Sequence, residues 1–438
     1  MRFRSILTVA VAVSIAATSA AACKSSGGGS GGNSSAANTG SAPSSGGGGG
    51  GGKTLVIGTD LPLQGASADT SADTNRMIQL YLDSIHSKAG NFTIKLKTYD
   101  DSTAAKGAWD DAACAANAKA HVANTQEVAV MGTYNSGCAD IELPVLNQDP
   151  NGPMLMVSHA NTNPGLTKAW DAGEPQKYYP TGKRNYARVV TTDDYQGRAA
   201  ADFASHDLKA KSVYILNDNQ VYGKGVARAF QTQAQKDGMK ILGNDPWDAQ
   251  ASNYTSLFQK IKSKNPDMIY VGGIYDNNGG QLIKDKVSVL GSNSKVPLMA
   301  PDGFTGYPDL DKLAQGQGIY LTFAGLSTDV LSKVKGPGAT LLQAFQAKFG
   351  RAPAGSYPLY GVAATQVILA AIAKSDGTRA SITNQVFSGS GITIPQSESV
   401  TGKAIVINPQ TGDTSAKDIT VEILKNQKET FLKAQSVQ

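Results

Sequence analysis

Residues 53–438 alternate between short apolar strands and amphipathic helices, and the alternation starts anew halfway along the chain. The first run pairs strand patterns such as Thr54–Thr59 with helical spacings such as Asn75–Ile85. The second run begins at Ser212–Leu216 and includes the helical pattern Gly279–Leu290. Strands that alternate with helices favour parallel sheets with helices on both faces. We therefore predict an α/β fold class with two doubly wound parallel-sheet lobes.

Three changes of pattern divide this part of the chain. One follows the Pro-, Gly- and Tyr-rich segment 168–187, the next comes at 318–323, and the last comes at 402–406. Three crossings between lobes make both lobes discontinuous and give a three-crossing hinge. The predicted lobes are residues 53–190 plus 324–402 for the first and 191–323 plus 403–438 for the second.

The N-terminus has the pattern of a secretory signal, which we assign to residues 1–22. Arg2 and Arg4 precede a short apolar stretch, and small residues follow it. The stretch is shorter than the ~20 residues that a membrane span needs. Ala20-Ala21-Ala22-Cys23 resembles the lipobox of bacterial lipoproteins, which implies lipid on Cys23 and an extracytoplasmic protein anchored to the cell membrane. Ordinary secretion with an incidental cysteine is the alternative.

Residues 23–52 are almost all Ser, Gly, Asn, Ala and Thr, a composition that is typical of a flexible tether. The end of this segment, Gly47–Thr54, satisfies the P-loop pattern G-x-x-x-x-G-K-[ST]. A P-loop needs a strand before it and a helix after it, whereas here a Gly/Ser tract precedes it and a strand pattern follows. The match is therefore interpreted as chance.

Charge and histidine spacing exclude two classes of partner. The formal net charge falls from +5 to +3 when Arg2 and Arg4 leave with the signal, and no basic stripe occurs, so no nucleic-acid partner is predicted. The four histidines have no metal-ligand spacing, so neither a metal nor another cofactor is predicted.

Cys114 and Cys138 remain if Cys23 carries lipid. An even pair in an oxidising compartment favours a disulfide, which would contribute roughly 3 kcal/mol by closing its loop. Two unpaired buried thiols are the alternative.

Short motifs along nearly all of residues 53–438 resemble the type I periplasmic-binding proteins of ABC importers, closest to the group that binds leucine, isoleucine and valine. Each motif is weak alone, and their order and spacing carry the resemblance. They are Val56–Gly58 with Leu61–Gly65, Tyr99–Asp101, Gly132–Ser136, Asn163–Thr167, Asp193–Gly197, Asp218–Gly225, Gly272-Gly273 and Pro301–Gly303.

The resemblance implies two lobes that close around a small solute, and it implies ligand contacts at the ends of strands. Ser136 would bind a ligand carboxylate together with nearby amides, or it would only cap a helix. Ala160 and Thr162 would add backbone and hydroxyl contacts, unless they only form the turn before Asn163.

On the second lobe, the resemblance implies that Tyr222 closes over the ligand, with a core tyrosine as the alternative. Asp302 occupies the position of the family's carboxylate, usually glutamate, that pairs with a ligand ammonium. The alternative is an aspartate that starts a Pro-Asp-Gly turn.

Two departures concern the ligand side chain. Residues 65–69 lack the aromatic residue that many relatives carry there, and Ile274 occupies the position of a common ligand-contacting tyrosine, with Tyr275 one residue later. Ile274 and Tyr275 are both candidate ligand contacts. The predicted solute is a small amino acid, with a branched-chain amino acid favoured and with amides, ureas and aromatic acids as alternatives.

No enzymatic activity is predicted. The adjacent acids Asp100-Asp101 and Asp193-Asp194 would point to opposite sides of a strand, and no nucleophile or zinc motif occurs in the folded part. The resemblance implies ABC permease subunits as partners and a monomeric binding protein. A lipoprotein that senses a ligand and signals to a membrane receptor is the remaining alternative.

Overall fold

The structure is a computed structural model that describes residues 52–436. The predicted signal peptide, the lipidated Cys23 and the tether up to residue 51 lie outside the described residues. The described residues belong to one compact unit with two large sheets.

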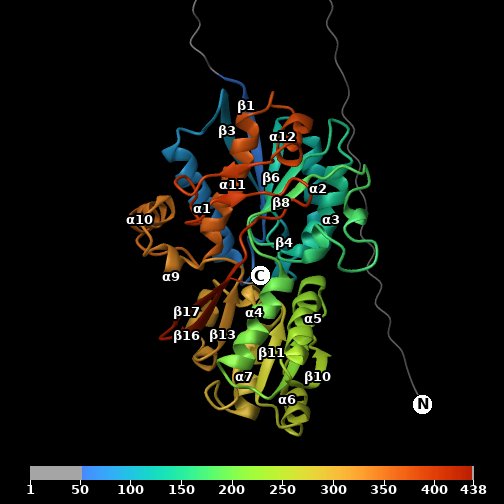
Figure 1. The fold of residues 1–438 in the computed structure, drawn as a ribbon, viewed down its shortest axis with the longest axis vertical. Coiled ribbons are helices and arrows are strands. Elements are labelled where there is room, and N and C mark those ends of the chain that lie inside the picture. The colour runs from blue at the N-terminus through green and yellow to red at the C-terminus, as the bar shows by residue number, and fades with distance from the viewer. Residues whose placement is uncertain (1–51, 437–438) are drawn as a thin grey trace, which may run out of the picture. The chain divides into compact units, whose positions relative to one another are not determined.

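The first lobe is built on a six-stranded sheet, in the upper half of Figure 1, with the order β2-β3-β1-β6-β7-β8. Its strands are β1 (Thr54–Leu61), β2 (Lys88–Ala89), β3 (Phe92–Asp100), β6 (Glu127–Gly132), β7 (Leu155–Ser158) and β8 (Tyr186–Arg188). All neighbours are parallel except β2, which pairs antiparallel with β3. Every residue of β1 after the first is buried, as is typical of a parallel strand covered on both faces.

Within residues 52–436, six α-helices belong to this lobe. They are α1 (Ala68–Ser84), α2 (Asp111–Ala123), α3 (Ser136–Asn147), α10 (Pro337–Phe349), α11 (Tyr357–Ala373) and α12 (Arg379–Phe387). Helix α11 packs on β6, β7 and α1 and is buried on nearly every side. Its apolar residues surround the helix axis, and this composition explains its interior position.

The second lobe is built on a seven-stranded sheet with the order β10-β9-β11-β12-β13-β16-β17, in which the first five strands are parallel and β16 and β17 are antiparallel. The strands are β9 (Ser212–Asn217), β10 (Lys240–Pro246), β11 (Met268–Gly272), β12 (Leu298–Ala300), β13 (Tyr320–Phe323), β16 (Asp418–Lys425) and β17 (Lys428–Ser436). The helices that accompany them are α4 (Asp193–His206), α5 (Val221–Lys236), α6 (Thr255–Lys262), α7 (Gly279–Leu290) and α8 (Pro308–Lys312). Helix α9 (Thr328–Leu331) contacts β17, but its Leu331 belongs to the apolar core of the first lobe. The two sheets confirm the predicted α/β class with two lobes.

Two short antiparallel pairs complete the strands. They are β4 (Ser102–Thr103) with β5 (Ala108–Trp109), and β14 (Thr393–Ile394) with β15 (Ile405–Val406).

The third crossing between lobes lies later than the predicted boundary at residues 402 and 403. Strand β15 pairs with β14, and Ile405 and Ile407 belong to the apolar core of the first lobe. Farther on, the carbonyl oxygen of Gly412 accepts a hydrogen bond from the backbone N–H of Arg188 at 3.0 Å. Residues 403–416 therefore stay with the first lobe, and the chain enters the second lobe at β16. The predicted boundary was too early because the change of pattern at 402–406 does not identify the lobe against which the following residues pack.

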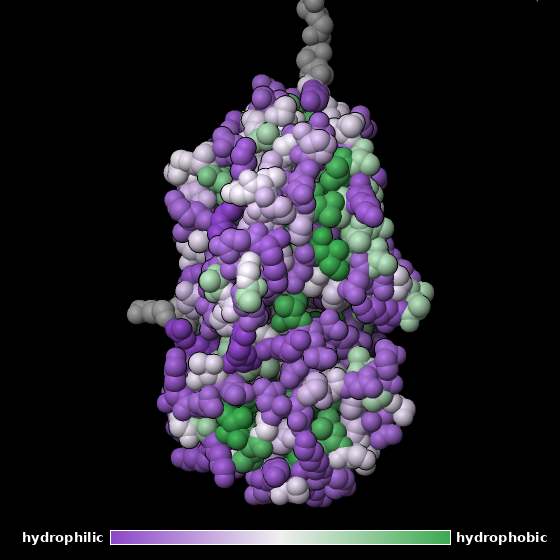
Figure 2. All heavy atoms as spheres, turned by 90° about the vertical axis from the view of Figure 1, so that its right-hand side faces the viewer, coloured by the Kyte–Doolittle hydropathy of each residue, from purple (hydrophilic) through white to green (hydrophobic). Residues whose placement is uncertain are grey.

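The face of the molecule shown in Figure 2 is mainly hydrophilic, with hydrophobic residues in small separate groups. Val334 and Leu432 are the only large hydrophobic residues that are exposed in the part of the chain that the structure describes. Between residues 52 and 436, no helix combines the length and the apolar character that crossing a membrane requires.

Candidate functional site

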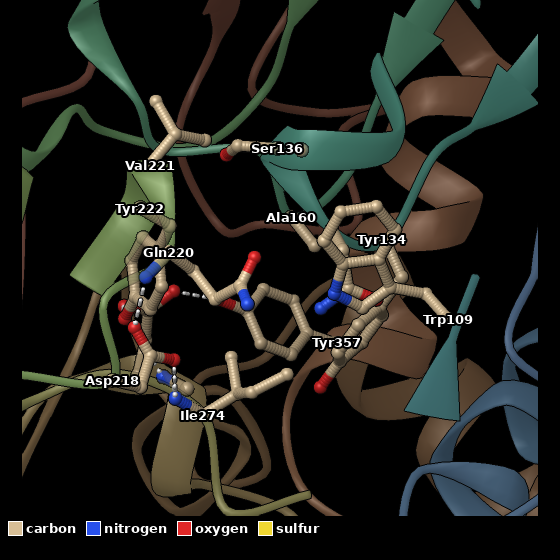
Figure 3. Close-up of a pocket in the computed structure, with 14 residues that line it drawn as sticks. Trp109, Tyr134, Ser136, Ala160, Asp218, Gln220, Val221, Tyr222, Ile274 and Tyr357 are labelled. Atoms are coloured by element: carbon tan, nitrogen blue, oxygen red, sulfur yellow. Dashed lines mark hydrogen bonds between the residues drawn. The ribbon is translucent and has the colours of Figure 1, made fainter. Parts of the chain in front are cut away.

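A pocket lies between the two lobes and is lined by residues from both. Most of the residues that line it follow the carboxyl ends of strands β6, β7, β9, β11 and β12, where ligands bind in doubly wound sheets. They are Trp109, Tyr134, Asn135, Ser136, Gly137, Ala160, Asp218, Gln220, Val221, Tyr222, Ile274, Asp302, Gly303 and Tyr357. In Figure 3, the rings of Trp109, Tyr134 and Tyr357 lie opposite Asp218, Gln220 and Tyr222.

Five of the seven predicted ligand contacts line this pocket. They are Ser136, Ala160, Tyr222, Ile274 and Asp302. The structure thereby brings together residues that are far apart in the sequence and belong to both lobes.

The other two predicted contacts, Thr162 and Tyr275, are not among the lining residues. The carbonyl oxygen of Thr162 accepts a hydrogen bond from the backbone N–H of Asp193 at 2.9 Å, at the start of α4. The Tyr275 ring packs against the rings of Phe304 and Tyr307, with centroids 5.9 and 5.0 Å away, in the core of the second lobe. Of the neighbours Ile274 and Tyr275, only the isoleucine reaches the pocket.

Asp302 is bound by donors from both lobes. Its carboxylate accepts hydrogen bonds from Gln196 Nε2 at 2.7 Å, from the Tyr222 hydroxyl at 2.5 Å, and from the Tyr357 hydroxyl of α11. Burial raises the pKa of Asp302, and the hydrogen bonds from Tyr222, Tyr357 and Gln196 offset part of that increase. All of these donors are neutral groups, so none of the hydrogen-bond partners described for Asp302 balances its charge.

Asp218 is held entirely by the second lobe. It accepts hydrogen bonds from the backbone N–H groups of Gln220 at 3.0 Å and Ile274 at 3.1 Å, and from Asn277 Nδ2 at 2.9 Å. Burial raises the pKa of Asp218 to about 6, and these hydrogen bonds oppose the increase. A Cβ atom at Gly273 would lie 2.6 Å from the carboxyl carbon, so this close approach requires glycine.

Three aromatic side chains form the wall on the first lobe. The rings of Tyr134 and Tyr357 meet edge to face with centroids 5.2 Å apart. Trp109 is the last residue of β5 and lies over the start of α3, where a Cβ atom at Gly137 would come within 2.5 Å of its ring. Sequence reasoning assigned no ligand contact to these three residues, although Tyr134 lies inside the motif Gly132–Ser136. Trp109 and Tyr357 lie in no motif that carried the resemblance.

The N-terminus of α3 faces the same pocket. Ser136 is the first residue of this helix, and its hydroxyl oxygen accepts a hydrogen bond from the backbone N–H of Asn163 at 3.4 Å. Free N–H groups at a helix start and the helix dipole attract anions. Among the fourteen described residues around the pocket, none is Lys, Arg or His. The pocket therefore combines a neutral anion-attracting end with two carboxylates and several aromatic rings.

Other contacts join the lobes outside the pocket. Asp276 of the second lobe accepts hydrogen bonds from the backbone N–H of Ser67 at 3.0 Å and from the Ser67 hydroxyl at 2.9 Å. The Tyr307 hydroxyl donates to the same carboxylate at 2.7 Å. Asp171 pairs with Arg228 of α5 at 2.7 Å, although both side chains are about half exposed. These contacts connect the lobes around the pocket.

A disulfide lies behind the aromatic wall. The structure joins Cys114 of α2 to Cys138 of α3, with Cα atoms 5.6 Å apart. Both cysteines belong to a small buried cluster with Trp109, Tyr222 and Ile274, so the disulfide holds α2 and α3 together next to the pocket.

The chain belongs to the periplasmic binding protein family, whose model matches residues 54–410. It is 28% identical over 326 residues to a Leu/Ile/Val-binding protein of Rhizobium johnstonii, a match that covers 73% of this chain and 79% of the relative.

Solved structures show the same fold. A leucine-binding protein from Thermotoga maritima superposes with a TM-score of 0.70 at 21% identity, covering 87% of this chain and 98% of the other. An ABC-transporter solute-binding protein from Rhodopseudomonas palustris, in complex with p-hydroxybenzoic acid, superposes with a TM-score of 0.72 at 17% identity, covering 88% and 98%. These likenesses agree with the two-lobe architecture that the sequence predicted.

Proposed function

We propose that this chain is the substrate-binding protein of an ABC importer and that it captures a small amino acid, with a branched-chain amino acid favoured. The observation that carries the proposal is the pocket between the lobes, with the N-terminus of α3 on one side and Asp302 on the other. A helix N-terminus suits a carboxylate and an uncompensated buried aspartate suits an ammonium group. Ile274, Ala160 and Val221 add apolar surface for a ligand side chain. The name of the Rhizobium johnstonii relative supports this ligand class.

Capture works by hinge closure in this proposal. Asp302 and Tyr222 move with the second lobe, while Ser136 and Tyr357 move with the first, so an open form would divide the site into two halves. A ligand that contacts both halves favours the closed form by its difference in affinity for the two states. The three crossings of the chain serve as the hinge.

The proposed location is the outer face of the cell membrane, with the body tethered through lipid on Cys23 and delivering solute to ABC permease subunits. Cys23→Ala is expected to release the protein from washed membranes without changing ligand affinity, because the tether separates the anchor from the pocket. Membrane fractionation with a ligand titration tests both statements. Persistent membrane attachment of the variant would refute the lipid anchor.

A second candidate ligand is a small aromatic acid. The three rings of Trp109, Tyr134 and Tyr357 favour it, since aromatic rings stack on one another. The Rhodopseudomonas palustris structure with p-hydroxybenzoic acid shows that the fold accommodates this class. Against it, such an acid has no positive group to pair with Asp302.

A thermal-shift screen with calorimetric titration tests the proposal. Leucine, isoleucine and valine are compared with p-hydroxybenzoate and small amides on the full chain. A bound ligand raises the melting temperature because it stabilises only the folded state. A shift with the amino acids supports the first candidate, a shift with p-hydroxybenzoate alone supports the second, and no shift with any solute would overturn both.

A further inference from the structure

Five buried titratable side chains gather inside the first lobe, apart from the ligand pocket. Asp60 lies on β1, Asp101 follows β3, His121 lies on α2, Glu127 is the first residue of β6, and Glu142 lies on α3. Each has 0% exposed surface. Asp60 and Glu127 contact the imidazole, and Asp101 and Glu142 add two further carboxyl groups that are fully buried.

The imidazole of His121 connects two of these carboxylates. Its Nε2 lies 3.0 Å from Asp60 Oδ2, and its Nδ1 is hydrogen-bonded to Glu127 Oε1. Glu127 also accepts hydrogen bonds from the Tyr99 hydroxyl at 2.7 Å and from Asn124 Nδ2 at 3.1 Å. Both carboxylate oxygens of Glu127 therefore have hydrogen-bond partners.

The other two carboxyl groups have no such donors. Both oxygens of Asp101 and Oε2 of Glu142 lack a hydrogen-bond partner among the described residues. Sγ of Cys138 lies 3.5 Å from Glu142 Oε1, but it carries no hydrogen to donate because it belongs to the disulfide. Buried polar groups normally have partners, so two unpartnered carboxyl groups in one cluster require a positive species or added protons.

We propose that Asp60, His121 and Glu142 bind a divalent transition-metal ion of the zinc or manganese type. One ligand atom from each of these residues lies within 4.8 Å of the others. The 3.0 Å between His121 Nε2 and Asp60 Oδ2 suits two ligands of one ion, since metal–nitrogen and metal–oxygen bonds are each about 2.0–2.2 Å. A mixed nitrogen and carboxylate set favours such ions over calcium or magnesium.

The second ring nitrogen supports this assignment. Metal-binding histidines usually donate their other N–H to a carboxylate or a carbonyl, which fixes the ring. Glu127 occupies that position on Nδ1 of His121. The ion would tie α2 and α3 to β1, and α3 begins with Ser136 at the ligand pocket. Its role is therefore structural, and it is independent of which solute the pocket takes.

The competing explanation is protonation of the two unpartnered carboxyl groups. Burial raises the pKa of Asp101 and Glu142 well above the ordinary range, so both would hold protons if no cation were present. The metal proposal and the protonation explanation predict different results in two measurements.

The first measurement uses the full wild-type chain with the metal alone. Protein purified without chelator is analysed for metals by mass spectrometry, then unfolded in EDTA and refolded with either EDTA or added Zn²⁺ or Mn²⁺. We expect one equivalent of metal per chain and a higher melting temperature after refolding with one of these ions. Absence of metal above the buffer blank, together with identical melting curves after all refolding conditions, would overturn the proposal.

The second measurement compares Glu142→Gln with the control Asp140→Asn, which alters a carboxyl group on the same helix outside the ligand set. Metal content and the gain in melting temperature on refolding with metal should both be lost in Glu142→Gln and kept in Asp140→Asn. Retention of both in Glu142→Gln would also overturn the proposal, since a glutamine replaces a protonated glutamate well but a metal-bound one poorly.

Discussion

Asp302 and Asp218 are two buried carboxylates on the same side of the pocket, but they are held in different ways. Asp302 accepts hydrogen bonds from Tyr222 and Gln196 of the second lobe and from Tyr357 of the first. Asp218 accepts all of its hydrogen bonds from within the second lobe, two of them from backbone N–H groups. Separation of the lobes would remove a donor from Asp302 and leave Asp218 unchanged.

This difference indicates that the two buried carboxylates have different roles. A carboxylate whose partners come from both lobes has an environment that depends on closure and on the ligand. A carboxylate whose donors all come from one lobe fixes the loop before α5, including Gln220, and the start of that helix at Val221. We therefore expect Asp302 to govern affinity and Asp218 to govern the shape and stability of the second lobe.

The largest expected effect is on affinity in Asp302→Asn. If the ligand carries an ammonium group, loss of its buried partner should cost about 2–5 kcal/mol, which is a weakening of roughly 30-fold or more. Calorimetric titration with the amino acid found in the screen measures it. Asp218→Asn is the control, with a smaller loss of affinity and a larger loss of melting temperature. Equal affinity losses in the two variants would contradict the division of tasks.

The next effect concerns stability and pH. The pKa of Asp218 rises from its ordinary value of 3.8 to about 6 on folding. A raised folded-state pKa means that the folded protein binds the proton more tightly than the unfolded protein does. The protonated Asp218 therefore makes its full contribution to the free energy of unfolding below about pH 4, and this contribution is lost as the pH rises through 6. The change amounts to at most about 3 kcal/mol.

Urea unfolding at several pH values between 4 and 7 measures that contribution. The difference in unfolding free energy between wild type and Asp218→Asn should shift across this interval in favour of the variant as the pH rises. A constant difference would show that the pKa of Asp218 is the same in the folded and unfolded states.

Asp276 joins the lobes without lining the pocket, so it tests whether contacts outside the pocket also influence ligand affinity. Asp276→Asn weakens its hydrogen bonds with Ser67 and Tyr307, and each bond to a charged group contributes about 1.5–3 kcal/mol. Partial loss should lower ligand affinity about tenfold by disfavouring closure. Asp267→Asn is the matched control, since Asp267 caps two backbone N–H groups within one lobe.

Titration measures the affinity of both variants, and small-angle scattering without ligand reports the opening of the lobes. A more open Asp276→Asn with weaker binding supports control of closure by interlobe contacts. Unchanged ligand affinity in Asp276→Asn would mean that residues in the pocket, and not this interlobe contact, control closure.

Regular parallel elements were predictable because their patterns are local. Helix α7 covers the same residues, 279–290, as its helical pattern, and β1 follows its apolar run. The hairpin that β16 forms with β17 was not predicted. The turn residues of this hairpin, Asn426 and Gln427, both have positive φ. Glycine usually marks such a turn in a sequence, and neither of these two positions is a glycine.

The site was predictable only where a motif carried the resemblance. Trp109 and Tyr357 enter the pocket from a short strand pair and from an interior helix, and neither location has a local signature. The cluster of Asp60, His121 and Glu142 was missed for a related reason, since its members lie on three elements and have no characteristic spacing. Close contacts between distant segments depend on how sheets and helices pack, and patterns within one segment do not contain that information.

The smallest expected effect is in Ser136→Ala, on the lobe opposite Asp302. The Ser136 hydroxyl is one neutral group beside the backbone N–H groups at the start of α3, and these remain in the variant. Its loss should cost about 1 kcal/mol, a weakening of roughly fivefold. Titration beside Asp302→Asn measures the ratio of the two effects. A loss in Ser136→Ala as large as that in Asp302→Asn would mean that the hydroxyl, and not the helix N-terminus, binds the ligand carboxylate. A ligand without an ammonium group would reverse the order, because Asp302→Asn would then remove no favourable charge pair while Ser136 still contacted the acid.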